Sequence, residues 1–164
     1  MSGWPDPTDD QGAVMRVDDP HVAYLRSQIA GDQQAVLGVM NELGARQMGP
    51  LVPFLREAFV LAVRRWFGPT FTHGQVIQLV ARIRALGADE PDFVNPVAAE
   101  SEICRALGED VPQHPDPIAR MGAQYVVLDF LVRLLDLDEY AIDALLAEAR
   151  YTADQTLAGL LFER

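Results

Sequence analysis

Arginine and aromatic side chains gather in one part of this sequence, residues 50–87. Residues 50–87 hold five arginines and one glutamate, a net charge of +4, whereas the rest of the chain holds eight arginines and 23 acidic residues, a net charge of −15. A guanidinium group binds carboxylates through paired hydrogen bonds, and arginine beside tryptophan is typical of protein interfaces. We therefore expect an acidic protein surface to bind here. The candidate binding residues are Arg56, Arg64, Arg65, Trp66, Arg82 and Arg84.

Two other interpretations of the same segment stay open. Two helices joined by the turn Gly-Pro-Thr-Phe at 68–71 also fit a helix-turn-helix, whose second helix would present Gln75, Gln78, Arg82 and Arg84 to DNA. The chain carries a net charge of −11, which disfavours nucleic acid because nucleic-acid-binding domains are usually basic. The segment also fits an ordinary helical hairpin whose arginines pair with acidic residues elsewhere in the fold.

Asp129 is a carboxylate within an otherwise apolar helical face. Arg133 follows four residues later, so the spacing predicts an ion pair along one helix. We expect a buried polar pair that gives specificity, or a polar spot that faces a groove or a dimer partner. The alternative is a carboxyl group with a raised pKa that acts as a general acid or base.

Residue types that the chain lacks exclude several reaction classes. None of its 164 residues is lysine. Walker-type nucleotide hydrolysis, protein-kinase chemistry and Schiff-base catalysis are excluded, because each needs a lysine amine. The serines lie outside any Gly-x-Ser-x-Gly motif. We predict no catalytic residue and no cofactor. After a protein-interaction module and a helix-turn-helix regulator, the third possible function is a cofactor-free helical enzyme that uses scattered carboxylates.

The histidines and the cysteine have no spacing typical of a metal site. His21 follows the aspartates at 18–19, but a helix start already explains acidic residues there. His73 and His114 have no neighbouring residue that suggests catalysis. Cys104 is expected to be a buried, inert thiol, and a single cysteine excludes an internal disulfide. The sequence therefore predicts no metal site.

The chain is long enough for one domain with a hydrophobic core. Its residues are 49% hydrophobic, and no apolar run is long enough for a membrane span. Residues 1–18 are rich in Asp, Gly and Pro, which predicts a disordered tail without the features of a signal peptide. Residues 19–164 then form a helical bundle domain. These features and the single cysteine lead us to expect a cytoplasmic protein.

Helical periodicity runs through residues 19–164. Apolar residues recur every three or four positions, and no segment alternates as a strand would. Helices are expected to start after Asp19, Asp32, Thr72, Asn95 and Asp116. Helices are expected to end at Gly31, Gly44, Gly68, Gly87 and Gly108. The fold class is therefore all-α, a single-domain bundle of six or seven helices.

Three of the expected helices have apolar surface that must be covered. The helix at 50–67 is apolar on most sides, which predicts a central position. Its main stripe is Val52, Leu55, Phe59, Ala62 and Trp66. The main stripe of the helix at 117–135 is Ile118, Met121, Tyr125, Leu128, Val132 and Leu135. The last helix is expected to follow a capping box of Asp136 and Glu139 and to bury Ile142, Leu146, Ala149, Ala153, Leu157 and Leu160. Burial within the domain is the first expectation, and a homodimer is the alternative.

The stretch Phe59-Val-Leu-Ala-Val-Arg-Arg-Trp-Phe-Gly68, followed by Val76-Ile-Gln-Leu-Val-Ala-Arg-Ile-Arg84, resembles small all-helical proteins of actinobacteria that carry no assigned activity. The resemblance implies a helical class and an actinobacterial source, and no substrate, cofactor or catalytic residue. The use of arginine without lysine indicates a GC-rich bacterial genome. We expect a cytoplasmic adaptor or regulator without a cofactor, whose partner is a protein with an acidic surface.

Overall fold

The computed structural model describes residues 19–44, 48–90 and 92–162, which form seven α-helices and no strand. The helices are α1 (Pro20–Ala30), α2 (Gln33–Leu43), α3 (Leu51–Phe67), α4 (His73–Leu86), α5 (Pro96–Ala106), α6 (Pro117–Leu134) and α7 (Glu139–Phe162). This confirms the predicted all-α fold for the described residues. The expected tail, residues 1–18, lies outside them. None of the described helices is long and apolar enough to cross a membrane.

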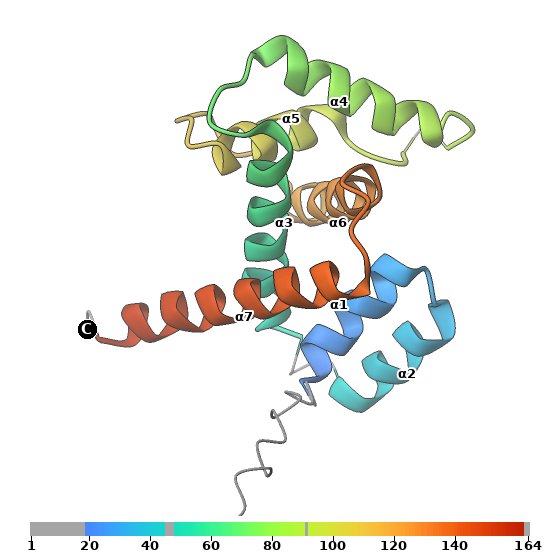
Figure 1. The fold of residues 1–164 in the computed structure, drawn as a ribbon, viewed down its shortest axis with the longest axis vertical. Helices are drawn as coiled ribbons and strands as arrows, with labels where there is room; N and C mark the ends of the chain where they lie inside the picture. The colour runs from blue at the N-terminus through green and yellow to red at the C-terminus, as the bar shows by residue number, and fades with distance from the viewer. Residues whose placement is uncertain (1–18, 45–47, 91, 163–164) are drawn as a thin grey trace, which may run out of the picture.

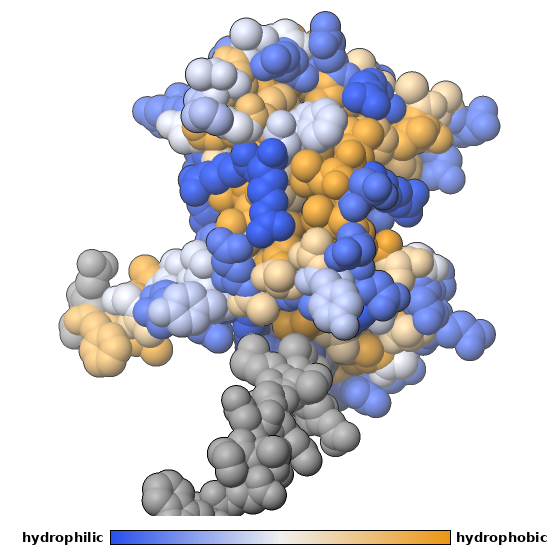
Figure 2. Space-filling model, viewed as in Figure 1, coloured by the Kyte–Doolittle hydropathy of each residue, from blue (hydrophilic) through white to orange (hydrophobic). Residues whose placement is uncertain are grey.

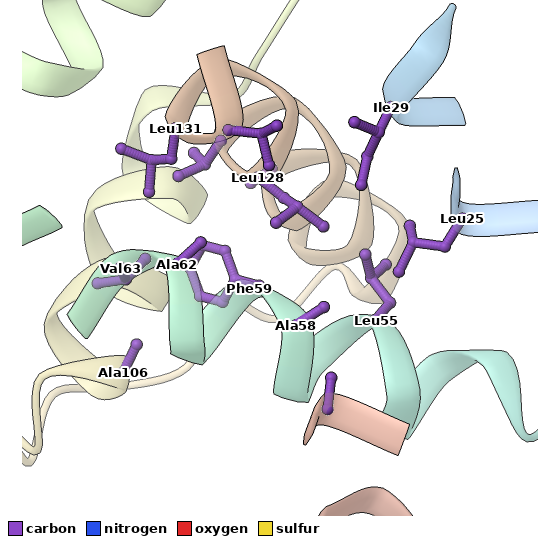
Figure 3. Packing of buried hydrophobic residues seen from close by; sticks show 14 of the residues in the cluster. Leu25, Ile29, Leu55, Ala58, Phe59, Ala62, Val63, Ala106, Leu128 and Leu131 are labelled. Carbon is purple, nitrogen blue, oxygen red and sulfur yellow. The ribbon is translucent and has the colours of Figure 1, made fainter. Parts of the chain in front are cut away.

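Helix α3 occupies the centre of the fold, as its apolar surface predicted. It contacts α1, α5, α6 and α7 (Figure 1). Phe59 of α3 and Leu128 of α6 point into the space between their two helices (Figure 3). The predicted stripe is wrong at both ends, because Val52 is exposed and Trp66 is only partly buried. The buried positions of α3 are Leu51, Phe54, Leu55, Ala58, Phe59, Ala62 and Val63.

Helix starts follow the local chemistry of the sequence. The side chains of Asp19, Asp32, Asn95 and Asp116 each accept a hydrogen bond from a backbone N–H in the first turn of α1, α2, α5 and α6. Thr72 and Gln75 form a reciprocal capping box at the start of α4. These bonds satisfy backbone donors that have no acceptor inside the helix. The predicted caps at these five positions are confirmed.

The start of α7 differs from the prediction. The Asp138 side chain accepts from the N–H of Ala141, so Asp138 rather than Asp136 caps this helix. Asp136 has a φ of 51° and follows the last turn of α6, where its N–H donates to the carbonyl of Arg133. A left-handed residue belongs to a helix C-terminus, and aspartate tolerates this conformation better than most residues.

Helix α6 buries only part of the stripe predicted for it, since Leu128 and Val132 of that stripe are buried. Ile118 is exposed and Met121 is at the surface, although both stand on the predicted stripe. The reason is that α6 contacts both α3 and α5, so its buried arc is wide and extends beyond the predicted stripe. The buried residues are Ala123, Gln124, Val127, Leu128, Leu131 and Val132.

Candidate functional site

Four of the six residues predicted to form one binding surface line two separate hollows. Arg56 and Arg64 line a hollow of about 180 Å³ together with Arg105 of α5. Trp66 and Arg82 line a separate groove of about 240 Å³. Each helical residue turns the side chain by about 100°, so Arg64 and Trp66 point roughly 160° apart around α3. The predicted continuous basic and aromatic surface is therefore divided.

Three of the predicted arginines make contacts inside the fold. Arg64 donates its Nε–H to the carbonyl oxygen of Ala106 at 3.0 Å. Arg65 forms an ion pair with Glu148 of α7 at 3.3 Å. The guanidinium carbon of Arg82 lies 5.9 Å from the centre of the Phe130 ring. Of these three contacts, that of Arg65 is with an acidic residue, as the helical-hairpin alternative predicted, whereas Arg64 contacts a backbone carbonyl and Arg82 an aromatic ring.

Arg56 and Arg84 differ from the other arginines of this segment. Within the described part of the chain, neither makes an ion pair, a side-chain hydrogen bond or a contact with an aromatic ring, whereas Arg64, Arg65 and Arg82 each make one of these. Arg56 stands at the rim of the hollow that contains Glu102 and Gln124. Glu102 is buried there, accepts from Gln124 Nε2 at 2.7 Å through Oε2, and has no partner for Oε1.

Asp129 and Arg133 form the ion pair that their spacing predicted, with Arg133 Nη2 3.1 Å from Asp129 Oδ2. Burial of the pair, the first of the two expectations, is wrong, whereas the other expectation, a polar spot that faces a groove, agrees with the structure. The side chain of Arg133 is 69% exposed and that of Asp129 is 36% exposed, because α6 turns this edge toward a groove. The groove encloses about 510 Å³ between α1, α4 and α6, and its lining is mostly apolar.

The groove beside Asp129 has few groups for acid–base chemistry. Burial raises the pKa of Asp129, and Arg133 partly lowers it. Tyr125 also lines the groove, and burial together with Tyr24 raises the pKa of its hydroxyl far above the usual range. Of the described residues that line it, none is a histidine and none is a second carboxylate. An active site of two carboxylates and a histidine is not assembled there.

The far end of α7 has a bare apolar surface. Helix α7 contacts α3 and α1 along its first half and then projects away from the other helices (Figure 1). Its last buried residue is Ala153. The projecting end appears as an apolar tip at the left of Figure 2. We name its four exposed side chains, Leu157, Leu160, Leu161 and Phe162, the distal α7 surface.

A cluster of three possible metal ligands was missed by the sequence analysis. The ligand atoms of His73, Cys104 and Glu109 all lie within 4.8 Å of one another. His73 Nε2 is 3.0 Å from Glu109 Oε2. The contact between Cys104 and Glu109 had a signal in the sequence, namely Gly108. A glycine at the end of α5 turns the chain so that Glu109 returns toward Cys104. The approach of His73 had none, because it depends on how α4 packs against α5.

The Cys104 thiol is buried, as predicted, and it lies against Glu109. Burial raises its pKa to about 11, and the neighbouring carboxylate of Glu109 adds to this effect by charge and by accepting a hydrogen bond. His21 Nδ1 lies 3.4 Å from Asp19 Oδ1. The same Asp19 carboxylate also pairs with Arg150 at 2.8 Å. Asp19 therefore acts as a cap and an ion-pair partner.

No family model, curated protein or solved structure matches this chain. The resemblance to small helical proteins of actinobacteria stays a prediction.

Proposed function

We propose that this protein is a protein-interaction module that pairs with a second copy of itself through the distal α7 surface. The observation that supports this best is the stripe of α7. Leu146, Ala149 and Ala153 are buried against the body, and Leu157 and Leu160 continue the same stripe into solvent. Monomeric proteins rarely leave large apolar side chains grouped at one exposed tip, because covering them is favourable.

The stability of the helix itself also favours a covered end. Residues 154–162 are helical, although the burial of α7 ends at Ala153. Short helical segments without tertiary packing are marginal in water. Gly159 weakens this segment further, because glycine inside a helix costs about 1 kcal/mol relative to alanine. Packing of the distal α7 surface would supply the missing stabilisation.

Charge supports a second copy as the occupant. The whole chain carries a net charge of −11, so two copies repel each other over most of their surfaces. Residues 155–162 contain no charged side chain, so contact between two copies of this tip places no like charges of these residues opposite each other. A two-fold axis brings the same patch of both copies together. Leu157, Leu160 and Leu161 have the three- and four-residue spacing that two antiparallel helices need for such packing.

The test is the mass of the full-length protein in solution across a range of concentrations. We expect a concentration-dependent rise from 18.1 kDa, the mass of one chain, toward twice that value. Leu160→Glu should weaken the association at least about tenfold, because it places a charge in an apolar contact. Leu37→Glu is the matched control, since Leu37 and Leu160 are both 60% exposed, and it should leave the mass unchanged.

Two results would contradict this proposal. The first is a single-chain mass at every concentration, which would leave the distal α7 surface to a different protein. The second is an equal effect of Leu37→Glu and Leu160→Glu, which would indicate general apolar association. Circular dichroism of each variant separates a lost contact from a lost fold.

An acidic protein partner is a second candidate, favoured by the groove that Trp66 and Arg82 line together. Gln75 and Gln78 line the same groove, which gives it polar groups beside an aromatic surface. Arg82→Glu combined with Arg84→Glu should then abolish capture of the acidic partner and leave the α7-mediated mass unchanged. Recovered nucleic acid, with binding that falls steeply as salt rises, would instead support the helix-turn-helix interpretation.

The proposal of a protein-interaction module includes a cytoplasmic location.

A further inference from the structure

We propose that His73, Cys104 and Glu109 bind a thiophilic divalent cation, with Zn²⁺ as the ion that fits their chemistry best. The cluster offers one imidazole nitrogen, one sulfur and one carboxylate oxygen. Zinc takes all three donor types, whereas magnesium and calcium prefer oxygen ligands alone. Three protein ligands leave the fourth position of a tetrahedral zinc ion to water. This site is independent of self-association through α7.

Local backbone geometry places Cys104 and Glu109 together. Gly108 follows the end of α5 with a φ of 91°, a left-handed conformation that glycine adopts without strain. The N–H of Glu109 donates to the carbonyl of Cys104 at 3.0 Å, and the N–H of Gly108 donates to the carbonyl of Arg105 at 3.0 Å. This pair of bonds is a Schellman motif, in which the residue after the glycine returns to the last turn of the helix.

Helix packing brings the third ligand. His73 is the first residue of α4, and the capping box of Thr72 and Gln75 fixes where this helix starts. Helix α4 packs against α5, and His73 Nε2 then lies 3.0 Å from Glu109 Oε2 and 3.1 Å from Oε1. The side chain of His73 is 67% exposed and that of Glu109 is 30% exposed, whereas Cys104 is buried, so an ion can reach the cluster from the side of His73 and Glu109.

The distances leave a small adjustment for the ion. Ligand atoms around a tetrahedral zinc ion lie roughly 3.3–3.8 Å apart, given bonds of about 2.0–2.3 Å. The three ligand atoms here lie within 4.8 Å of one another, so a displacement of about an ångström, by side-chain rotation, brings them to the separations of a zinc site. His73 is free to make that rotation because most of its surface faces solvent.

Charge and protons also balance. Zinc binds the thiolate form of cysteine, so binding breaks the Cys104 S–H bond, forms a Zn–S bond and releases one proton to solvent. The thiolate and the Glu109 carboxylate together neutralise the two charges of the ion. The ion would replace the present contacts of Glu109 with His73 and Cys104, and would join the start of α4 to the end of α5.

The experiment uses the full-length protein without a histidine tag, freed of metal by chelation, and titrated with Zn²⁺ or Co²⁺ alone. We expect one ion per chain and, with Co²⁺, the absorption of a tetrahedral site with a thiolate-to-metal charge-transfer band. Loss of groups that only orient zinc ligands weakens binding about 10- to 100-fold. Loss of a ligand, in His73→Gln or Glu109→Gln, should weaken it by at least that range.

The controls are chosen to match each ligand. His114→Gln and Asp110→Asn change a neighbouring histidine and acid outside the cluster, and both should bind zinc like the wild-type protein. Cys104→Ser should remove the charge-transfer band. If that variant unfolds, His73→Gln decides, because the exposed imidazole is not needed for folding. Zinc affinity that is unchanged in His73→Gln and Glu109→Gln, or a cobalt complex without the thiolate band, would overturn the proposal.

Discussion

Arg64 donates its Nε–H to the carbonyl oxygen of Ala106 at 3.0 Å, which joins the central helix α3 to the last residue of α5. Carbonyls at a helix C-terminus lack an intrahelical donor, and the partial negative charge there favours a cation. A residue that the sequence marked for partner binding is therefore engaged within the fold.

Arg64→Ala should lower the free energy of unfolding by about 1 kcal/mol, because it leaves the Ala106 carbonyl without this donor. Arg56→Ala removes an arginine from the same helix face without such a bond, and should change stability by less than about 0.5 kcal/mol. Urea denaturation of both variants measures the difference. Equal effects would mean that the bond to Ala106 contributes nothing measurable.

Gly87→Ala should destabilise the protein by about 1–3 kcal/mol, because an added Cβ would overlap the ring of Phe93. Gly87 ends α4, but its φ of −104° is open to any residue, so close packing explains the glycine there. Gly122→Ala is the control, since no neighbouring atom lies within 4 Å of the new Cβ. That change inside α6 should stabilise by about 0.5–1 kcal/mol. Thermal unfolding measures both, and a stabilised Gly87→Ala variant would refute the packing argument.

Gln124→Met should destabilise the protein by about 1–3 kcal/mol, because it removes the hydrogen bond from Gln124 to Oε2 of the buried Glu102. Oε1 of Glu102 already has no partner, so both oxygens would then lack a hydrogen bond. Adding Glu102→Met should recover part of this loss, since both partners are then apolar. A double-mutant cycle from chemical denaturation gives the coupling between the two side chains. Additive effects would show that the bond does not couple them.

The stability of the protein should depend on the titration of Asp129. Its folded-state pKa is raised above the ordinary value of 3.8, chiefly by burial. The folded state therefore holds this proton more tightly than the unfolded chain. The stabilisation that Asp129 gives to the folded state is therefore present below pH 3.8, and it is lost as the pH rises through the folded-state pKa. Across this pH range, the free energy of unfolding of Asp129→Asn should rise relative to that of the wild-type protein. The difference should be less than about 1 kcal/mol, because the side chain is partly exposed.

Arg133→Gln should raise the pKa of Asp129 further, because the guanidinium lowers it through its charge and hydrogen bond. An NMR titration of the Asp129 carboxyl carbon in both proteins measures this directly. Arg84→Gln removes an arginine outside this ion pair and serves as the control. A lower or unchanged pKa in Arg133→Gln would show that the ion pair is not maintained in solution.

Sequence alone identified the fold class and most helix boundaries. Thr72, Asn95 and Asp116 cap helices within a few residues of themselves, so their effect could be inferred without tertiary information. The exceptions also have local causes. Asp136 and Asp138 both stand near the start of α7, and only the backbone conformation shows that Asp136 ends α6 while Asp138 caps α7.

The candidate sites were far less predictable than the helices. Arg64 and Trp66 are neighbours in sequence, yet they line different hollows. Ile118 stands on a regular apolar stripe and is nevertheless exposed. The face that a helix buries depends on the helices around it, and α6 has neighbours on two sides. Periodicity specifies that an apolar face exists, but it does not specify which other helix covers it.

The sequence by itself determined where the chain is helical and that it offers no lysine amine for chemistry, since caps, periodicity and the absence of lysine are local or compositional properties. Tertiary structure alone decided that the arginines separate, that the end of α7 is bare, and that His73 meets Cys104 and Glu109. These outcomes depend on how helices distant in sequence cross one another, and that crossing is fixed by packing of the whole core.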